Sequence, residues 1–253
     1  MRYNVLLQHS FKEIFKEKTL LLPHIYLFIL GFGFLVGISG AQTIVPDEFT
    51  LVLASIGYLL VFVLLESIVL ATFNNHVKRH KNDPIHQLYT GSRIVSRVLV
   101  AKIAKMILFW FPLAIVLSLL FSFSELLISS SFALNFGLFL LSLLVLLLLF
   151  LITVAFGFLS FVTLSFYEVQ ITRTRVVKSA KEVFSFVTNN LDKVFVTGLY
   201  LLGFLVVFLL VSSMLSGYLS GVILYFIHGL ISVPLWAAMI LFIFKVYENA
   251  SKN

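Results

Sequence analysis

Every lysine and arginine of this chain lies in one of four segments, and long apolar stretches separate those segments. The four segments are residues 1–18, 78–105, 173–193 and 245–252. A helix needs roughly 20 mostly apolar residues to cross the hydrocarbon core of a bilayer, which is about 30 Å thick. Six stretches meet that requirement, with approximate bounds 19–41, 50–73, 103–123, 136–166, 194–215 and 221–244. The sequence therefore predicts an all-α integral membrane protein with six transmembrane helices.

The composition excludes a soluble globular protein. Of the 253 residues, 60% are hydrophobic and 11% are charged, which leaves too little polar surface to cover a soluble globule of this size. The longest polar interval has about 30 residues, whereas a soluble domain normally has about 50 or more. Transmembrane β-strands would alternate apolar and polar residues, but residues 138–156 are apolar almost throughout. We expect residues 1–253 to form a single helical transmembrane domain.

The basic residues also predict the orientation of the spans. The N-terminal tail holds four of them, the interval after the second span seven, the interval after the fourth span five, and the C-terminal tail two. The other three loops hold none, and their charged residues are Asp47, Glu48 and Glu125. Loops rich in lysine and arginine stay on the cytoplasmic side of a membrane. Both termini are therefore predicted to be cytoplasmic.

The net charge of +7 indicates the kind of partner. Basic residues next to spans meet anionic lipid headgroups, at about 1 kcal/mol for each residue near the surface. We therefore expect anionic lipid of the bilayer, and not nucleic acid, as the partner. The chain has no cysteine, which excludes disulfides and thiolate metal sites, and we expect no cofactor and no metal. Binding of another protein and association into a homo-oligomer are left open.

Three basic intervals have the pattern of amphipathic helices. Within 176–187 the apolar residues recur at the spacing of one helical face. They are Val176, Val177, Ala180, Val183, Phe184 and Val187, opposite Lys178, Lys181, Glu182 and Ser185. The N-terminal tail places Leu7, Phe11, Ile14 and Phe15 opposite Lys12, Glu13, Lys16 and Glu17, and residues 93–102 show a looser version. Such helices lie at the headgroup boundary, and the residues predicted to bind anionic lipid or a partner are Arg93, Arg97, Lys102, Arg173, Arg175, Lys178 and Lys181.

Two of these intervals also share sequence. SFKEIF at 10–15 and SAKEVF at 179–184 agree at serine, lysine, glutamate and phenylalanine, and each continues into a span within about ten residues. The chain can thus be divided into three repeated helix-hairpin units. Each unit has an interfacial helix, an outward span, a short outer turn and a returning span.

The interval around residue 180 belongs to a longer pattern over residues 160–205. An apolar span ends in a glutamate, and a basic amphipathic helix with small residues and an aromatic residue then continues through an asparagine into the next span. The positions are Glu168, Ser179, Ala180, Phe184, Ser185 and Asn190. The pattern resembles a block in a broad group of prokaryotic six-helix membrane proteins of unknown function, which is similar to the membrane domain attached to some glycerophosphodiester phosphodiesterases. The resemblance implies a multi-pass protein of a prokaryotic cytoplasmic membrane.

The chain departs from that block in one place. The usual glycine a few residues after the glutamate is absent, and Ile171–Arg173 occupy that region. The sequence also contains no phosphodiesterase domain, so the resemblance does not imply that activity.

Glu66 is the most informative polar residue inside an expected span. It lies eight residues before Asn74, hence about 12 Å inside the inner boundary of the membrane. A charge at that depth costs at least about 2–3 kcal/mol, so it indicates a function unless a partner compensates it. The expected partner is Lys105, with Lys102 second. The alternatives are a packing pair or a protonated glutamate, a transport or proton-relay role, and binding of a lipid headgroup.

His228 and Glu168 are further candidates. A single histidine within an apolar helix is more often held by an interhelical hydrogen bond than used as a ligand, and we expect that for His228. Glu168 ends the fourth span near Arg173 and Arg175, which predicts an interfacial salt bridge. Pro112 and Pro234 lie inside expected spans, where each removes a backbone hydrogen bond.

The sequence contains no catalytic motif such as HExxH, GxSxG or a glycine-rich phosphate loop. The leading prediction is a non-enzymatic accessory or scaffold protein that binds anionic lipid or a partner through its basic cytoplasmic helices. The alternative is a small transporter or permease built around Glu66. A membrane-embedded lipid enzyme with its site near Glu168 is a third.

Overall fold

The structure is a computed structural model of the chain, and it describes residues 2–41, 48–78, 83–107, 111, 114–116, 118, 136–217 and 221–251. The named elements of this part are all α-helices, and no strand occurs among the described residues. The helices are α1 (Tyr3–Lys16), α2 (Lys18–Ala41), α3 (Glu48–Val77), α4 (Pro84–Lys105), α6 (Phe136–Ile171), α7 (Val176–Asn189), α8 (Leu191–Ser216) and α9 (Gly221–Ala250). The predicted all-α fold is confirmed for this part of the chain.

Four helices are long and apolar enough to cross a membrane. The qualifying segments are Ala54–Val77 in α3, Leu143–Ile171 in α6, Leu191–Ser216 in α8 and Phe226–Ala250 in α9. The apolar part of α2 that is fully described, Lys18–Phe34, is shorter. About half of the expected span at 103–123, including Pro112, lies outside the described residues. The apolar helices indicate a membrane-embedded protein, and the count of six spans stays a prediction.

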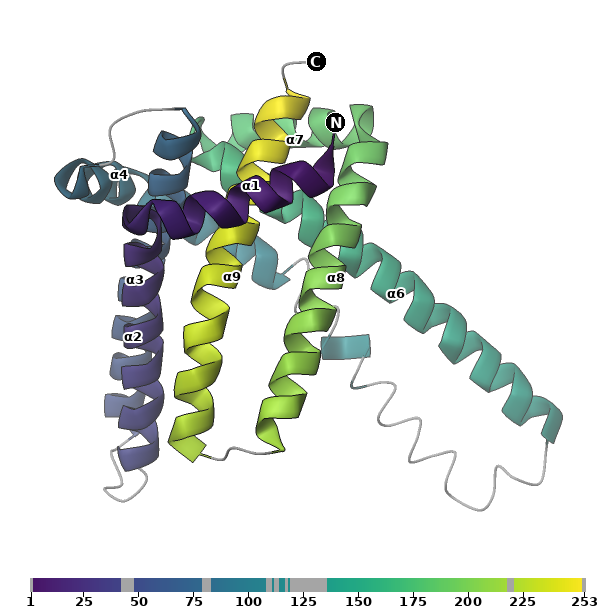
Figure 1. The fold of residues 1–253 in the computed structure, drawn as a ribbon. Helices are drawn as coiled ribbons and strands as arrows, with labels where there is room; N and C mark the ends of the chain where they lie inside the picture. Colours follow the sequence, from purple (N-terminus) through teal and green to yellow (C-terminus); the bar gives the residue numbers. More distant parts are fainter. Residues whose placement is uncertain are drawn as a thin grey trace.

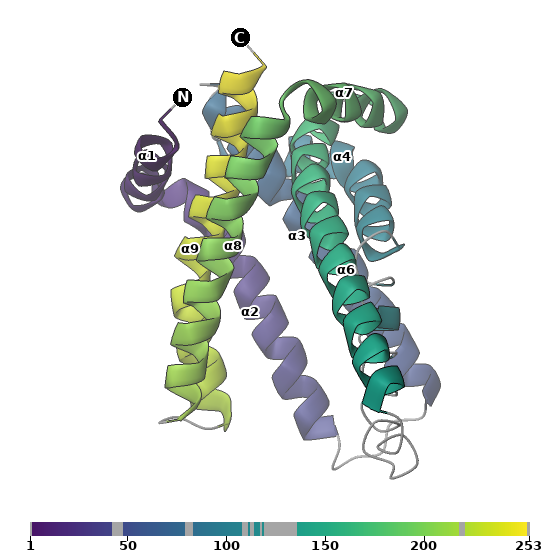
Figure 2. The same cartoon turned by 90° about the vertical axis from the view of Figure 1, so that its right-hand side faces the viewer.

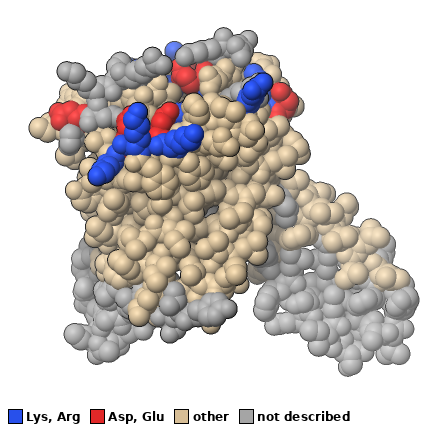
Figure 3. Space-filling model, viewed as in Figure 1, with Lys and Arg blue, Asp and Glu red and all other residues tan. Residues whose placement is uncertain are grey.

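Both chain termini lie at one end of the helical bundle (Figure 1). The short amphipathic helices α1 and α7 lie across that end, while α2, α3, α8 and α9 run away from it (Figures 1 and 2). Lysine, arginine, aspartate and glutamate side chains gather there on the face shown in Figure 3, and other residue types cover the remainder of the described surface. We call it the charged end.

α4 crosses α3 at a steep angle instead of running alongside it. Gly91 of α4 lies against Ile68 of α3, and Lys102 of α4 contacts Glu66 of α3. Eleven residues of α-helix span about 16 Å, whereas two residues span about 3 Å. Contacts so far apart on α4 and so close on α3 require a crossing. Only glycine permits this approach, because a Cβ atom at Gly91 would lie 2.6 Å from Ile68 Cγ1.

The best-packed part of the molecule lies in the half of the bundle next to the charged end. The fully buried side chains there include Phe73, Phe166, Phe242 and Phe244, from α3, α6 and α9. Toward its other end, α6 exposes about half of each leucine surface, for example at Leu147 and Leu151. Exposed leucines of this density are typical of a helix that faces lipid. The charged side chains described next lie in the packed half.

Candidate functional site

Four charged side chains meet where α3, α4 and α6 approach one another. We call Glu66, Lys102, Lys105 and Glu168 the inner quartet. Lys102 pairs with Glu66 and lies 3.4 Å from Glu168 Oε1, and Lys105 Nζ donates a hydrogen bond to Glu168 Oε1 at 3.0 Å. The exposed side-chain fraction is 17% for Glu66 and 15% for Glu168 and for Lys105. Two carboxylates thus share two ammonium groups in a largely buried place.

The quartet pairs differently from the sequence prediction. Lys105 was the expected first partner of Glu66, but the structure pairs Glu66 with Lys102 and gives Lys105 to Glu168. The reason is the crossing of α4. Lys102 lies where α4 passes over α3, and Lys105, almost one turn further on, reaches α6. Glu168 forms a salt bridge, as predicted, but its partners are Lys105 and Lys102 of α4, whereas Arg173 pairs with Glu248 of α9.

The quartet ties three helices together, and removal of one member would leave a buried charge without compensation. A complete set is close to neutral in its energetic effect, since the cost of desolvation offsets the attraction. One hydrogen-bond acceptor of the quartet has no donor: Glu66 Oε2 is buried, and no described residue donates a hydrogen bond to it. Glu66 therefore keeps one oxygen available for a donor.

Two arginines among the predicted lipid-binding residues are used inside the protein. Arg173 forms an ion pair with Glu248 of α9 at 2.8 Å and donates a hydrogen bond to Asn74 Oδ1 of α3 at 3.1 Å. Arg97 of α4 donates to the carbonyl oxygens of Ile171 and Thr174 at 3.5 and 3.2 Å. Both side chains satisfy backbone or carboxylate groups where α6 ends. Together with Lys102, they are held by protein contacts.

The other four predicted lipid-binding residues are exposed. Arg93 lies on the outer side of α4 with its guanidinium 4.8 Å from the centre of the Tyr89 ring. Arg175, Lys178 and Lys181 lie at the start and on the outer side of α7, where Lys178 makes a 3.7 Å ion pair with Glu182. These four cations are the part of the predicted set that can meet a headgroup.

The helix α7 divides its apolar side chains between two environments. Val183 and Val187 are buried against the bundle, as the amphipathic pattern predicts for a packed face. Val177 and Phe184 are exposed at 70% and 71%, although they belong to the same predicted face. An apolar side chain left exposed beside exposed lysines is the arrangement of an interfacial helix.

The positions that carry the family resemblance have local structural roles. Ser179 is buried, and its hydroxyl lies 2.7 Å from Thr174 Oγ1, which closes the turn before α7. Asn190 separates α7 from α8, and its side-chain amide donates to the Phe186 carbonyl at 3.0 Å. Ala180 and Ser185 are exposed.

A second ionic cluster fastens α1 to the bundle, and we call it the α1 clamp. Glu13 accepts from Lys245 of α9 at 2.7 Å and lies 2.9 Å from His76 Nε2 of α3, while Glu17 lies 3.0 Å from His76 Nδ1. Burial raises the pKa of Glu13, but the hydrogen bonds from Lys245 and His76 outweigh it, so the pKa lies below its usual value. The sequence analysis missed these pairs, because they join the first helix to the third and the last.

His228 of α9 behaves as the sequence analysis expected. It forms a hydrogen bond with Ser212 of α8, and its ring packs edge-on against Phe208 at 4.6 Å between centroids. The histidine thus makes an interhelical hydrogen bond, and its helix α9 contributes no residue to the inner quartet. Pro234 lies inside α9, as predicted.

Comparison of the chain with models of protein families, with curated proteins and with solved structures finds no match. The resemblance to the prokaryotic six-helix group therefore stays a prediction. The functional argument depends on the geometry of the chain itself.

Proposed function

We propose that the chain is a non-enzymatic accessory or scaffold protein of a prokaryotic cytoplasmic membrane. It would cross the membrane six times, with the charged end in the cytoplasm, and bind anionic lipid through α7. The observation that carries the proposal is the position of α7. It lies across the charged end (Figure 2) and exposes Arg175, Lys178 and Lys181 beside the apolar Val177 and Phe184.

The order of the helices supports the division into three repeated units. Each unit would begin with a short amphipathic helix, namely α1, α4 or α7. Two long apolar helices follow in the first and third units, α2 with α3 and α8 with α9. In the second unit α6 is the returning span, and the outward span would be the stretch at 103–123. Each unit would then start and finish on the cytoplasmic side, in agreement with the distribution of basic residues.

The lipid-binding proposal is tested with purified protein in detergent, to which phosphatidylglycerol or phosphatidylcholine is added and bound lipid is counted by native mass spectrometry. The test variant is R175Q/K178Q/K181Q. Each cation near an anionic surface contributes about 1 kcal/mol, so loss of three weakens phosphatidylglycerol binding by up to roughly 100-fold. The charge-preserving variant R175K/K178R/K181R is the matched control and keeps the affinity. Equal binding by the wild type and the glutamine variant overturns the proposal.

The topology is tested by labelling, which is simple because the chain has no cysteine. One variant carries Thr43→Cys in the first outer loop, and the other carries Lys252→Cys in the C-terminal tail. A membrane-impermeant maleimide added to intact cells labels the first and not the second. Labelling of both, or of the C-terminal variant alone, contradicts the proposed orientation.

A second candidate function is transport through the bundle, and the unsatisfied Glu66 Oε2 favours it. The two apolar pockets described in the structure are lined by other residues. The test is proton flux into proteoliposomes under a pH gradient. A flux that E66Q abolishes and the conservative E66D preserves would favour transport, whereas no flux above that of empty liposomes would exclude proton transport.

A further inference from the structure

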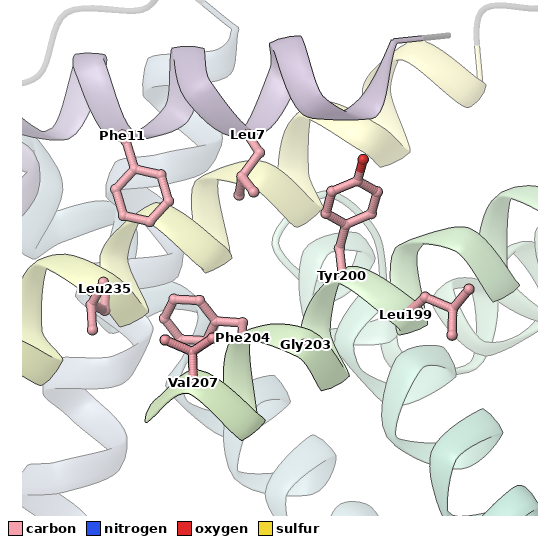
Figure 4. Close-up of a pocket in the computed structure, with 8 residues that line it drawn as sticks. All are labelled: Leu7, Phe11, Leu199, Tyr200, Gly203, Phe204, Val207 and Leu235. Carbon is pink, nitrogen blue, oxygen red and sulfur yellow. The ribbon is translucent and has the colours of Figure 1, made fainter. Parts of the chain in front are cut away.

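An apolar groove lies between α1, α8 and α9 (Figure 4). Leu7 and Phe11 point down from α1, and the floor and sides include Gly203, Phe204 and Val207 of α8 and Leu235 of α9. Its volume is about 580 Å³. Binding sites for small molecules usually have about 300–1,000 Å³. The space is therefore large enough for a ligand and carries no charged lining residue among those described.

The length of the groove is close to the thickness of one bilayer leaflet. α8 and α9 are both candidate spans, and the groove follows α8 from Leu199 to Val207. Eight residues of helix cover about 12 Å, close to the half-thickness of about 15 Å of a hydrocarbon core. α1 covers the groove on the side of the charged end (Figure 4). A ligand that runs parallel to the spans fits this shape.

Two basic residues belong to the helices that line the groove, Lys12 to α1 and Lys193 to α8. Lys12 follows Phe11 on α1 and is exposed, and Lys193 lies seven residues before Tyr200, hence on the same face of α8 and two turns nearer the charged end. Asp192 is the acidic neighbour of Lys193. Tyr200 directs its hydroxyl toward α1 (Figure 4). Two cations and a hydroxyl above an apolar groove are complementary to a phosphate attached to a hydrocarbon chain.

We infer that the groove binds one acyl chain of a phospholipid from the leaflet at the charged end, with the lipid phosphate near Lys12 and Lys193. The competing occupant is a helix of a second copy of this chain. Such a helix would place apolar side chains in the groove, and it would make the protein a dimer. The groove is separate from α7, and this site does not depend on the proposed role of α7.

The chain offers a substitution that fills the groove without disturbing the packing. A Cβ atom at Gly203 would have nothing within 4 Å, so Gly203→Leu projects into empty space. Leucine is also a better helix former than glycine, so the helix is not weakened. Gly33→Leu is the matched control. Its Cβ atom is equally free, and it fills a different apolar pocket, between α2 and α3.

The primary measurement is native mass spectrometry of protein washed extensively in detergent. The wild type and Gly33→Leu retain one more phospholipid molecule than Gly203→Leu does, while all three have the same helical content by circular dichroism. Equal numbers of retained lipids overturn the inference. The inference is also overturned if the wild type is a dimer and Gly203→Leu is a monomer, since a second copy would then occupy the groove.

A second measurement locates the chain. Trp236 lies at the edge of the groove, with its ring centroid 6.2 Å from that of Phe204, and the chain has one other tryptophan, Trp110. In a Trp110→Phe background, phosphatidylglycerol with brominated acyl chains quenches the fluorescence of Trp236. Quenching falls in Gly203→Leu and is unchanged in Gly33→Leu. Equal quenching in both variants contradicts a chain inside the groove, and loss of binding by R175Q/K178Q/K181Q leaves this result unaffected.

Discussion

Replacement of Lys102 by methionine gives the sharpest test of the inner quartet, because it removes one charge and keeps a long side chain. Glu66 then loses the only cation that the described part of the chain holds within ion-pair distance of it, whereas Glu168 keeps Lys105 at 3.0 Å. Removing one partner of a buried pair typically costs about 3–5 kcal/mol. Lys105→Met costs less, about 1.5–3 kcal/mol, since it removes one charged hydrogen bond and leaves Lys102 beside Glu168.

Protonation limits the cost of Lys102→Met. An unpaired Glu66 can take up a proton, and holding it costs about 1.36 kcal/mol for each pH unit above the ordinary glutamate pKa of about 4.3. The limit is therefore about 3.7 kcal/mol at pH 7 and about 1.6 kcal/mol at pH 5.5. The difference in stability between wild type and Lys102→Met should shrink by about 2 kcal/mol over that range.

The free energy of unfolding is measured in mixed micelles with increasing dodecyl sulfate, followed by circular dichroism, at both pH values. A double-mutant cycle tests which of the two lysines pairs with Glu66. Glu66→Gln with Lys102→Met should show a coupling of about 0.5–3 kcal/mol, whereas Glu66→Gln with Lys105→Met should be nearly additive. The reverse pattern, with Glu66→Gln rescuing Lys105→Met and not Lys102→Met, would refute the crossing of α4 over α3 and the pairing derived from it.

Two further predictions concern packing and pH. Gly91→Ala should lower stability by about 1–3 kcal/mol because its Cβ would meet Ile68, whereas Gly203→Ala should be neutral or stabilise by up to about 1 kcal/mol; thermal unfolding compares them. Folding lowers the pKa of Glu13, so its stabilising contribution is complete above the ordinary value and is lost as the pH falls through the lowered one. A nitroxide on Gln8→Cys should therefore gain mobility in acid, and Glu13→Gln should mobilise it already at pH 7; a label equally immobile in both proteins would contradict the role of the α1 clamp.

Much of the helical architecture could be predicted from the sequence. Five of the six apolar stretches expected to span the membrane lie in helices, α2, α3, α6, α8 and α9, and four of these helices are long and apolar enough to cross it in the described part of the chain. The three predicted amphipathic intervals correspond to α1, α4 and α7, since their residue spacing is a local property. The pattern alone was less accurate about burial. Val177 and Phe184 share a predicted face with Val183 but remain exposed, because the bundle covers only part of that face.

The ion pairs required the tertiary structure. Their positions in the expected spans identified Glu66 and Glu168 as charges that need partners, yet the crossing of α4 over α3 decided which lysine reaches which glutamate. Likewise, the sequence assigned Arg97 and Arg173 to lipid, and the structure uses both to satisfy groups at the end of α6.

The physical reason is that hydrophobic periodicity depends on neighbours in the sequence, whereas ion pairing depends on neighbours in space. Hydrophobic burial and helical periodicity are summed over neighbouring residues, so they can be read from a short window of sequence. An ion pair depends on a few ångströms between side chains of different helices. Glu13 and Lys245 meet only because the first helix packs against the last. The sequence by itself determined which segments are helical and apolar, and the packing of those helices decided which charges are compensated and which remain free to meet lipid.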